Sequence, residues 1–426
     1  MRDIVITAIL GALILMSLRR PDIGVLTWTW VSMMNPHRLT YGFAYSQPFA
    51  MMIAVATLVG LLVSRDKKHL PLTAPVVLLL LFDLWMVLTH FTGFHPDLVA
   101  NKALDILKIQ LMVFVTILVL HNRKHINWFV AVIAFSIGFF GVKGGIFTIL
   151  KGGSYRVWGP DSSMLEGNNE IALAIIMTIP LIYYFFVTTQ RKWLKRALLA
   201  AMILCAASAL GSQSRGALLA LVAMGGVLWW RSQKKVLSAV MIAIVAGALI
   251  SAMPASWTER MGTMRTYDED LSALQRLDAW RLTWNLALDN PILGGGMGIY
   301  TDDLNARYNP TPIGGLRNAH SIYFSVLGEQ GFPGLFLFLG IWLSVWWSCA
   351  DIRRKTRRVP DLNWAFWLAS AVQMSLIGYL AGGAFLYLAY ADFPYNLLII
   401  TVVIRKCLAD RLSSHQAPVK PSVALA

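Results

Sequence analysis

RNAHSIYFSVLGEQGFPG, residues 317–334, is the stretch that decides how this chain folds. Its first residues end the one long polar stretch of the sequence, and the residues after them begin a new apolar segment. His320 therefore falls where a membrane-embedded helix would meet water. The segments before and after this boundary show what surrounds that histidine.

The composition is that of a membrane protein built from helices. Hydrophobic residues make up 57% of the 426 residues and charged residues 14%, whereas a soluble protein usually carries about a quarter charged residues. Apolar runs long enough to span a bilayer recur from end to end. The sequence lacks the alternating strands of a membrane barrel. We therefore predict an all-α, polytopic membrane protein.

The net charge of +15 does not indicate nucleic-acid binding, because the basic residues lie in short loops between apolar runs. Their clusters are at 65–68, 123–124, 191–196, 231–235, 353–358 and 405–411. They fall in every second loop, as the positive-inside rule expects of loops that face the cytoplasm. We predict that the intervening loops, with the long stretch 253–318, face the other side, and that the C-terminus is cytoplasmic.

The apolar segments give about twelve candidate spans. Those after residue 47 are 48–63, 74–88, 103–120, 128–150, 171–187, 197–210, 217–230, 236–252, 321–347, 364–388 and 395–404. For the two short pieces 4–18 and 24–34 we favour one full crossing and a partly inserted segment, although two crossings would give thirteen spans. The predicted divisions are N-terminal transmembrane helices (1–252), an external loop (253–318), C-terminal transmembrane helices (319–411) and a cytoplasmic tail (412–426).

The external loop is too small to be an independent enzyme domain, so we expect it to pack on the bundle. Its strongest predicted helix covers 272–289 and suits the membrane interface, because apolar residues recur on one face at helical spacing. These residues are Leu274, Leu277, Trp280, Trp284 and Leu288. Asn290-Pro291 ends this helix, and the glycines at 294–296 and 298 predict a tight turn.

The external loop carries arginines but no lysine. The arginines are Arg260, Arg265, Arg276, Arg281, Arg307 and Arg317. Arginine binds phosphate through two parallel hydrogen bonds, and an external basic cluster runs against the usual charge distribution of membrane proteins. We interpret the cluster, above all Arg276 and Arg281, as a site for an anionic lipid-linked ligand. The alternative is that these arginines pair with acidic side chains of the same loop.

Two shorter external segments carry further arginines. Arg215 opens a predicted span, where its guanidinium and the backbone N–H groups could face a phosphate together. The alternative for Arg215 is a side chain that extends to the membrane surface. Arg156 lies in the loop before the span 171–187, where it is either part of the site or an ordinary solvated charge.

His320 differs from the other histidines because charged residues surround it in the sequence. Arg317 precedes it by three residues, and Glu329 follows nine residues later. A neutral histidine near its usual pKa can accept a proton from a substrate hydroxyl. Glu329 could orient partners or support the helix that carries the histidine. The His and Glu residues show no recurring ligand spacing, so we expect a site without a metal.

Several motifs, taken in order, resemble the O-antigen ligase and polymerase superfamily. They are Ser214-Arg215-Gly216, Arg276-x-x-x-Trp280, Asn290-Pro291-x-x-Gly294-x-Gly296-x-Gly298, His320-Ser321 and Gly328-Glu329-x-Gly331-x-x-Gly334. The resemblance covers most of the chain and rests on motif order and placement. Arg19-Arg20-Pro21, 34–40 and 43–45 further resemble an exosortase-associated branch of O-glycosylation ligases. Ser321 departs from the pattern, which more often has asparagine there.

The resemblance implies a GT-C-like, inverting glycosyltransferase of the bacterial inner membrane that uses no metal or other cofactor. Such a ligase takes a glycan from undecaprenyl diphosphate on the periplasmic side and transfers it to a lipid A–core sugar. Its partners are therefore the donor, the acceptor and membrane lipids. By motif, His320 would be the general base, and Arg215 and Arg276 would bind the diphosphate. The secondary candidates are Arg156, Arg281, Arg317 and Glu329.

Three other functions stay open. A polymerase uses the same donor but adds the glycan to another lipid-linked glycan, and a protein O-glycosylation ligase transfers it to a Ser or Thr. A polysaccharide-lipid transporter would share the many spans and the cationic lipid contacts without any covalent chemistry. The sequence lacks the paired, broken segments that are typical of such transporters.

Overall fold

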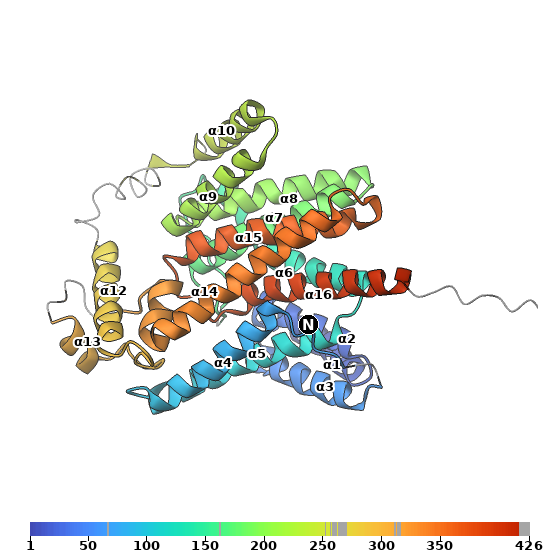
Figure 1. Ribbon diagram of the computed structural model, residues 1–426. Helices are drawn as coiled ribbons and strands as arrows, with labels where there is room; N and C mark the ends of the chain where they lie inside the picture. The colour runs from blue at the N-terminus through green and yellow to red at the C-terminus, as the bar shows by residue number, and fades with distance from the viewer. Residues whose placement is uncertain are drawn as a thin grey trace, which may run out of the picture.

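The computed structural model describes residues 1–65, 68–161, 163–251, 253–255, 257, 262, 271–310, 312 and 317–416. Every regular element in this part of the chain is helical, and most of the helices run side by side as a bundle (Figure 1). The predicted all-α class is therefore confirmed. The last ten residues of the predicted cytoplasmic tail lie outside the described residues.

The helices follow the apolar runs of the sequence. The N-terminal ones are α1 (Arg2–Ser17), α2 (Pro21–Met34), α3 (Phe49–Val63), α4 (Ala74–Thr92), α5 (Ala100–Val119), α6 (Arg123–Leu150), α7 (Asn168–Thr188), α8 (Lys192–Gly211), α9 (Arg215–Arg231) and α10 (Lys235–Ser251). The later ones are α12 (Leu271–Asp289), α13 (Asp302–Tyr308), α14 (Ile322–Thr356), α15 (Asn363–Gly383) and α16 (Asp392–Gln416). Single 3-10 turns are η1 (Pro36–Leu39), η2 (Phe43–Ser46), η3 (Asp97–Val99) and η4 (Pro360–Leu362).

Six of the described helices are long and apolar enough to cross a membrane, which is consistent with a polytopic membrane protein. They are α4, α6, α7, α8, α14 and α15 with its preceding turn. Helices α1, α2, α3, α9 and α10 have 14 to 17 residues each, fewer than the roughly 20 that a bilayer requires. The total of about twelve spans, the orientation and the GT-C-like architecture stay predictions.

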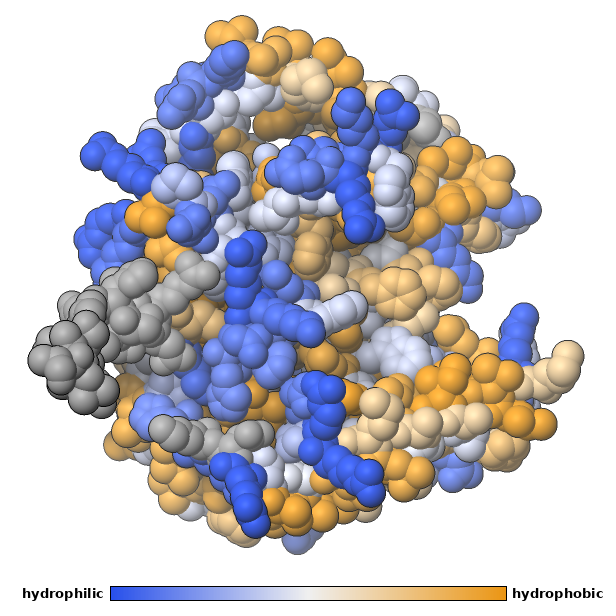
Figure 2. Space-filling view, turned by 90° about the vertical axis from the view of Figure 1, so that its right-hand side faces the viewer, coloured by the Kyte–Doolittle hydropathy of each residue, from blue (hydrophilic) through white to orange (hydrophobic). Residues whose placement is uncertain are grey.

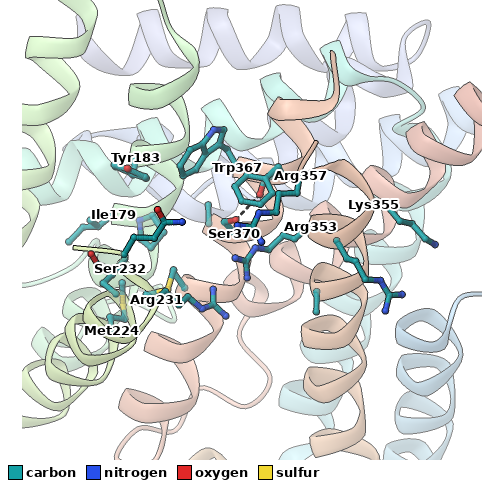
Figure 3. A pocket seen from close by; sticks show the side chains of 18 of the residues that line it. Ile179, Tyr183, Met224, Arg231, Ser232, Arg353, Lys355, Arg357, Trp367 and Ser370 are labelled. Carbon is teal, nitrogen blue, oxygen red and sulfur yellow. Dashed lines mark hydrogen bonds between the residues drawn. The ribbon is translucent and has the colours of Figure 1, made fainter. Parts of the chain in front are cut away.

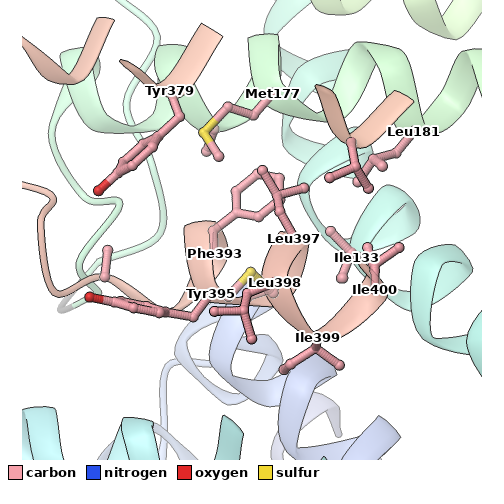
Figure 4. Packing of buried hydrophobic residues seen from close by; sticks show 14 of the residues in the cluster. Ile133, Met177, Leu181, Tyr379, Phe393, Tyr395, Leu397, Leu398, Ile399 and Ile400 are labelled. Carbon is pink, nitrogen blue, oxygen red and sulfur yellow. The ribbon is translucent and has the colours of Figure 1, made fainter. Parts of the chain in front are cut away.

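The C-terminal helices form the centre of the bundle. Residues 395–404 at the start of α16 are all buried, and Figure 4 shows their side chains packed among Ile133 of α6, Met177 and Leu181 of α7 and Tyr379 of α15. A helix that is apolar on all sides belongs in such a position. The predicted span 364–388 extended too far, because α15 ends at Gly383 and residues 384–391 form a loop.

Helix α12 lies across the ends of the long helices rather than parallel to them (Figure 1). Leu282, Thr283 and Leu286 are buried on its inner side. Thr283 lies against Gly328 of α14, whereas Leu282 and Leu286 pack with Ile299, Leu304 and Tyr308 of the segment that follows α12. Trp284 and Leu288, from the predicted apolar face, are exposed at 45% and 57%. The helix is therefore apolar on two sides, and the exposed side suits contact with lipid.

The opposite end of the bundle has a different surface. Figure 2 shows that hydrophilic side chains gather across the middle of this end and that apolar side chains surround them. The basic segments 191–196 and 353–358 lie at helix ends on this side, as the C-terminal ends of α7 and α14 place them. The two ends of the bundle are thus chemically distinct.

Helix α14 is broken inside its first third. Gly331 has φ of 67° and ψ of −174°, outside the helical region, and Pro333 follows. The break lets the Phe332 N–H donate to the Pro291 carbonyl at 2.9 Å instead of continuing the helix. Only glycine adopts this backbone conformation readily, which explains its place in the motif.

The turn after α12 is hydrogen-bonded to this break. The Gly295 N–H donates to the Gly328 carbonyl at 2.8 Å, and the Gly296 N–H donates to the Glu329 carbonyl at 3.0 Å. The Phe94 N–H at the end of α4 donates to the Gly295 carbonyl at 3.0 Å. We call residues 93–94, 291–296 and 328–332 the glycine junction, because it fixes α4, α12 and α14 to one another.

Replacing Gly331 with alanine is expected to lower the melting temperature of the purified protein in detergent. A Cβ there would lie 2.3 Å from the Ile292 carbonyl oxygen, and the backbone conformation alone would cost about 1–3 kcal/mol. The matched control is Gly226→Ala in α9, where no atom lies within 4 Å of the added Cβ. Equal melting temperatures for the two variants would contradict the role assigned to the junction.

Candidate functional site

The backbone of His320 is held in an unusual conformation just before α14. Its φ is 44°, in the left-handed region that few residues other than glycine adopt. The carbonyl of the preceding Ala319 accepts a hydrogen bond from Trp280 Nε1 at 2.7 Å, and Ser321 caps α14 through the Phe324 N–H. Strain of this kind persists only where the surroundings fix it, and it is concentrated at functional sites.

Helix α12 supplies those surroundings. The Trp280 ring stacks on Phe324 of α14 with centroids 4.8 Å apart and planes 10° apart, and it also meets Phe385 at 6.2 Å. Arg276 precedes Trp280 by about one turn, so both project from the same face of α12. The motif Arg276-x-x-x-Trp280 therefore places the Arg276 guanidinium on the same helix face as the tryptophan that holds the backbone before His320.

The electrostatics around His320 favour its neutral form. Burial lowers the pKa of His320 from its ordinary 6.5, and the positive charges of Arg276 and then Arg317 lower this pKa further. The ring is therefore uncharged at neutral pH, with one nitrogen able to accept a proton. A half-buried, neutral histidine between two arginines has the properties of a general base beside an anion site.

Arg276 also interacts electrostatically with Glu170 at the start of α7. Two residues before Glu170, Asn168 Nδ2 donates to the Ser212 carbonyl at 2.8 Å, which joins α7 to the loop before α9. Glu170 is not among the site residues predicted from the sequence. The feature that could have indicated Glu170 is its carboxylate at the start of an apolar span. Its interaction with Arg276 depends on the tertiary structure, because the two residues belong to different helices.

Arg215 is the first residue of α9 at the same end of the bundle. Ser214 caps this helix by accepting from the Ala217 N–H, and the preceding Gln213 has a positive φ of 57°. Gly216 lies against Phe385, since a Cβ there would be 3.5 Å from that side chain. Phe385 thus contacts both Gly216 and Trp280. Gly216 is the neighbour of Arg215, and Trp280 supports His320.

The other candidate arginines differ in their surroundings. Arg317 is exposed and acts on His320, as described above. Arg281 lies 3.9 Å from Asp278 and Arg307 3.0 Å from Asp289, so part of the cluster pairs with acids of the same loop. Arg156 is exposed in the loop between α6 and α7. Arg260 and Arg265 lie outside the described residues.

Glu329 is fully buried and belongs to a separate cluster. Its carboxylate accepts hydrogen bonds from the Tyr387 and Tyr390 hydroxyls, both at 2.7 Å, and lies 3.8 Å from Lys102 Nζ. Glu329 follows His320 by nine residues, which is about 13 Å along a helix. This cluster therefore lies further along α14 and not next to the histidine. These contacts support the reading of Glu329 as part of the packing of α14.

Comparisons with known proteins address the same region. Residues 200–339 match the family described as O-antigen ligase, and residues 1–191 match a family of unknown function (DUF5935). The match over residues 200–339 supports the resemblance to the O-antigen ligase superfamily. A search among curated proteins found no match. The family match supports an enzyme of glycan ligation that handles lipid-linked glycans in a membrane.

The O-antigen ligase domain contains most of the candidate residues. Arg215, Arg276, His320 and Glu329 lie within 200–339, whereas Arg156 lies in the N-terminal match. That N-terminal match does not decide whether the exosortase-associated branch is the right one. Within the described part of the chain, no three His, Cys, Asp or Glu side chains are grouped so as to hold a metal ion. The metal-free site stays a prediction.

Replacing Arg276 with glutamine is expected to raise the pKa of His320. The change removes a positive charge that disfavours the imidazolium, so the histidine should titrate at higher pH than in the wild type. NMR of histidine-labelled protein in micelles would measure this titration, and His320→Gln would assign the signal. Arg307→Gln is the control, because Arg307 pairs with Asp289. Identical titrations in the two arginine variants would contradict the arrangement.

Proposed function

We propose that this protein is a ligase that transfers a glycan from undecaprenyl diphosphate to a lipid A–core sugar. In this proposal the reaction takes place at the periplasmic face of the bacterial inner membrane. The observation that carries it is a neutral, half-buried His320 held beside Arg276 inside an O-antigen ligase domain. An acceptor hydroxyl needs a base, and a diphosphate leaving group needs fixed cations.

The proposed reaction is an inverting displacement. The acceptor oxygen forms a bond to the anomeric carbon while the bond from that carbon to the diphosphate oxygen breaks. His320 takes the proton of the acceptor hydroxyl, and the diphosphate leaves with the bonding electron pair. Arg276, with Arg215 from α9, stabilises the charge that develops on the departing diphosphate. Arg317 and Arg156 are secondary contacts to the donor in this proposal.

Two features of the structure bear on this arrangement. The left-handed backbone of His320 and the hydrogen bond from Trp280 fix the base before substrate binds. The apolar outer side of α12, with Trp284 and Leu288 exposed, provides a surface for the lipid tail of a donor. Together they support a lipid-linked donor that approaches from the membrane, next to the arginines.

Replacing His320 with alanine is expected to abolish ligation, because removal of a general base typically costs about a hundredfold to ten-thousandfold in rate. The measurement is the lipopolysaccharide profile of a deletion strain that expresses either wild type or the variant. The variant should reach the membrane but leave the core without long glycan, while lipid-linked polymer accumulates. His95→Ala is the control, since His95 pairs with Asp303 elsewhere at this end.

Different profiles would identify a different function. A single glycan repeat that remains attached to the core would indicate a polymerase. Unchanged lipopolysaccharide together with loss of glycan from proteins would indicate a protein O-glycosylation ligase. Wild-type lipopolysaccharide in the His320→Ala strain would contradict the assignment of the base.

Replacing Arg215 or Arg276 with alanine is expected to lower kcat/KM for the lipid-linked donor by about tenfold to a hundredfold, the range expected for one charged hydrogen bond. Lysine should restore little activity, because it lacks the planar fork that binds two phosphate oxygens. Transfer by the purified protein in detergent measures both effects, and Arg307→Ala serves as the control. Unaltered kinetics in the Arg215 and Arg276 variants would exclude the diphosphate role.

A further inference from the structure

A large cavity lies at the end of the bundle opposite to His320 (Figure 3). Its volume is about 1310 Å³, and α7, α8, α9, α14 and α15 contribute to its wall. Helices α9 and α14 each pack against α15, and the cavity has walls from both. About 30 Å of helix separates Pro333 from Arg353 on this wall, and His320 lies beyond the break at Gly331, so the cavity is distinct from the candidate active site.

The wall of the cavity has two chemically different parts. Its deep part is apolar and includes Met202, Met224 and Trp367. Its rim is basic and consists of Arg231, Arg353, Arg354, Lys355, Arg357 and Arg358. A ligand that fills the whole cavity would therefore combine an apolar body with an anionic head.

Two of the rim arginines converge on one neutral group. Arg231 Nη2 and Arg353 Nη1 both donate to Gln373 Oε1, at 3.2 and 2.8 Å. Each guanidinium also lies over an aromatic ring, Arg231 at 5.3 Å from the Trp346 centroid and Arg353 at 5.5 Å from the Phe366 centroid. Figure 3 shows both side chains directed into the same space.

This pair has no counter-charge of its own. Neither Arg231 nor Arg353 forms an ion pair with a carboxylate among the residues that the structure describes, and the buried Nε of Arg353 lacks a hydrogen-bond partner there. Two cations held around one amide oxygen repel each other. Such an arrangement is stable only if an anion binds between them or water reaches both.

The neighbouring basic residues show the contrast. Arg354 and Lys355 each lie 2.7 Å from a carboxylate oxygen of Asp351, and both are largely exposed. Asp351 therefore pairs with two of the outer basic residues, whereas Arg357 and Arg358 are exposed and form no ion pair with a carboxylate that the structure describes. The inner pair differs from these exposed residues because both of its side chains are half-buried beside the apolar wall.

We propose that this cavity binds an anionic phospholipid of the adjacent membrane leaflet. The headgroup phosphate lies between Arg231 and Arg353, whose planar guanidinium groups match phosphate oxygens, and the acyl chains follow the apolar wall. A free phosphate ion would satisfy the arginines but leave the apolar wall exposed. The lipid fills both parts and adds a link between α9 and α14, in addition to the contact of Arg231 with Trp346.

The test is lipid binding by the full-length protein, purified in a neutral detergent and freed of lipid. Native mass spectrometry would count bound phosphatidylglycerol and phosphatidylcholine over a concentration series. We expect phosphatidylglycerol to bind about tenfold or more tightly than phosphatidylcholine, because both carry the phosphate but the basic rim repels the choline cation. Inorganic phosphate at the same concentrations should not displace it.

The double variant Arg231→Gln/Arg353→Gln should remove most of this preference. The matched control is Arg191→Gln/Arg196→Gln, which removes two exposed arginines at the same end that do not line the cavity. Leu228→Trp places a larger side chain on the apolar wall and so fills part of the cavity. It should weaken lipid binding without changing the charge. This variant keeps the test valid if the double variant does not fold.

Three results would overturn the proposal. One is equal binding of the two lipids by the wild type. Another is an equal loss of preference in the cavity variant and in the surface control, which would indicate general attraction to charge. The third is displacement of the lipid by inorganic phosphate, which would assign the inner arginines to a soluble anion instead.

Discussion

The hydrogen bonds between the glycine turn after α12 and the broken turn of α14 are the constraint on which the candidate site depends. Backbone groups of residues 328 and 329 lose their helical partners at the break and bond to Gly295 and Gly296 instead. No side chain fits between these backbones, since a Cβ on Gly294 would lie 2.5 Å from the Gly331 nitrogen. The junction therefore sets where the first turns of α14, and with them His320, lie against α12.

Burial and positive charge act together on the histidine. Each alone lowers its pKa, and the arginines that lower it further are the groups that attract an anion to its side. A lower pKa makes the neutral form abundant at pH 7 but also makes the nitrogen a weaker base. As the base of the proposed reaction, His320 would thus be abundant in its neutral form but weak, which suits a reaction whose proposed leaving group, a diphosphate, needs little help beyond fixed cations.

Much of this fold follows from the sequence, and the remainder depends on packing. Apolar runs and charged interruptions located most of the helices to within about five residues, because both reflect local physical properties. The predicted spans 321–347 and 395–404 ended too early, because α14 and α16 continue as helix into the basic segments that follow them. The break at Gly331 could not be placed from the apolar pattern, since that pattern continues through it and only the partner turn at 291–296 makes the break favourable. The apolar outer face of α12 was predicted, but its buried inner side depends on α14 and on the segment that follows α12.

The site divides in the same way. The types of residue in the motifs pointed to His320, Arg215 and Arg276, whereas no sequence pattern links Glu170 of α7 to Arg276 of α12. Lys102 comes from α5, and Tyr387 and Tyr390 come from the loop 384–391. They meet Glu329 only because α15 stops early and leaves this loop. Contacts between elements far apart in sequence have no local signature, so a single sequence does not reveal them.

The proposed donor site and the base are also coupled through Arg276. When a diphosphate binds at Arg276, its negative charge offsets the positive charge that disfavours the imidazolium, and the pKa of His320 rises. The histidine is then a stronger base in the complex with donor than in the empty enzyme. An acceptor hydroxyl that arrives first meets a weak base and no electrophile. In the proposed reaction, the strength of the base therefore depends on whether the donor is bound, without any movement of the chain.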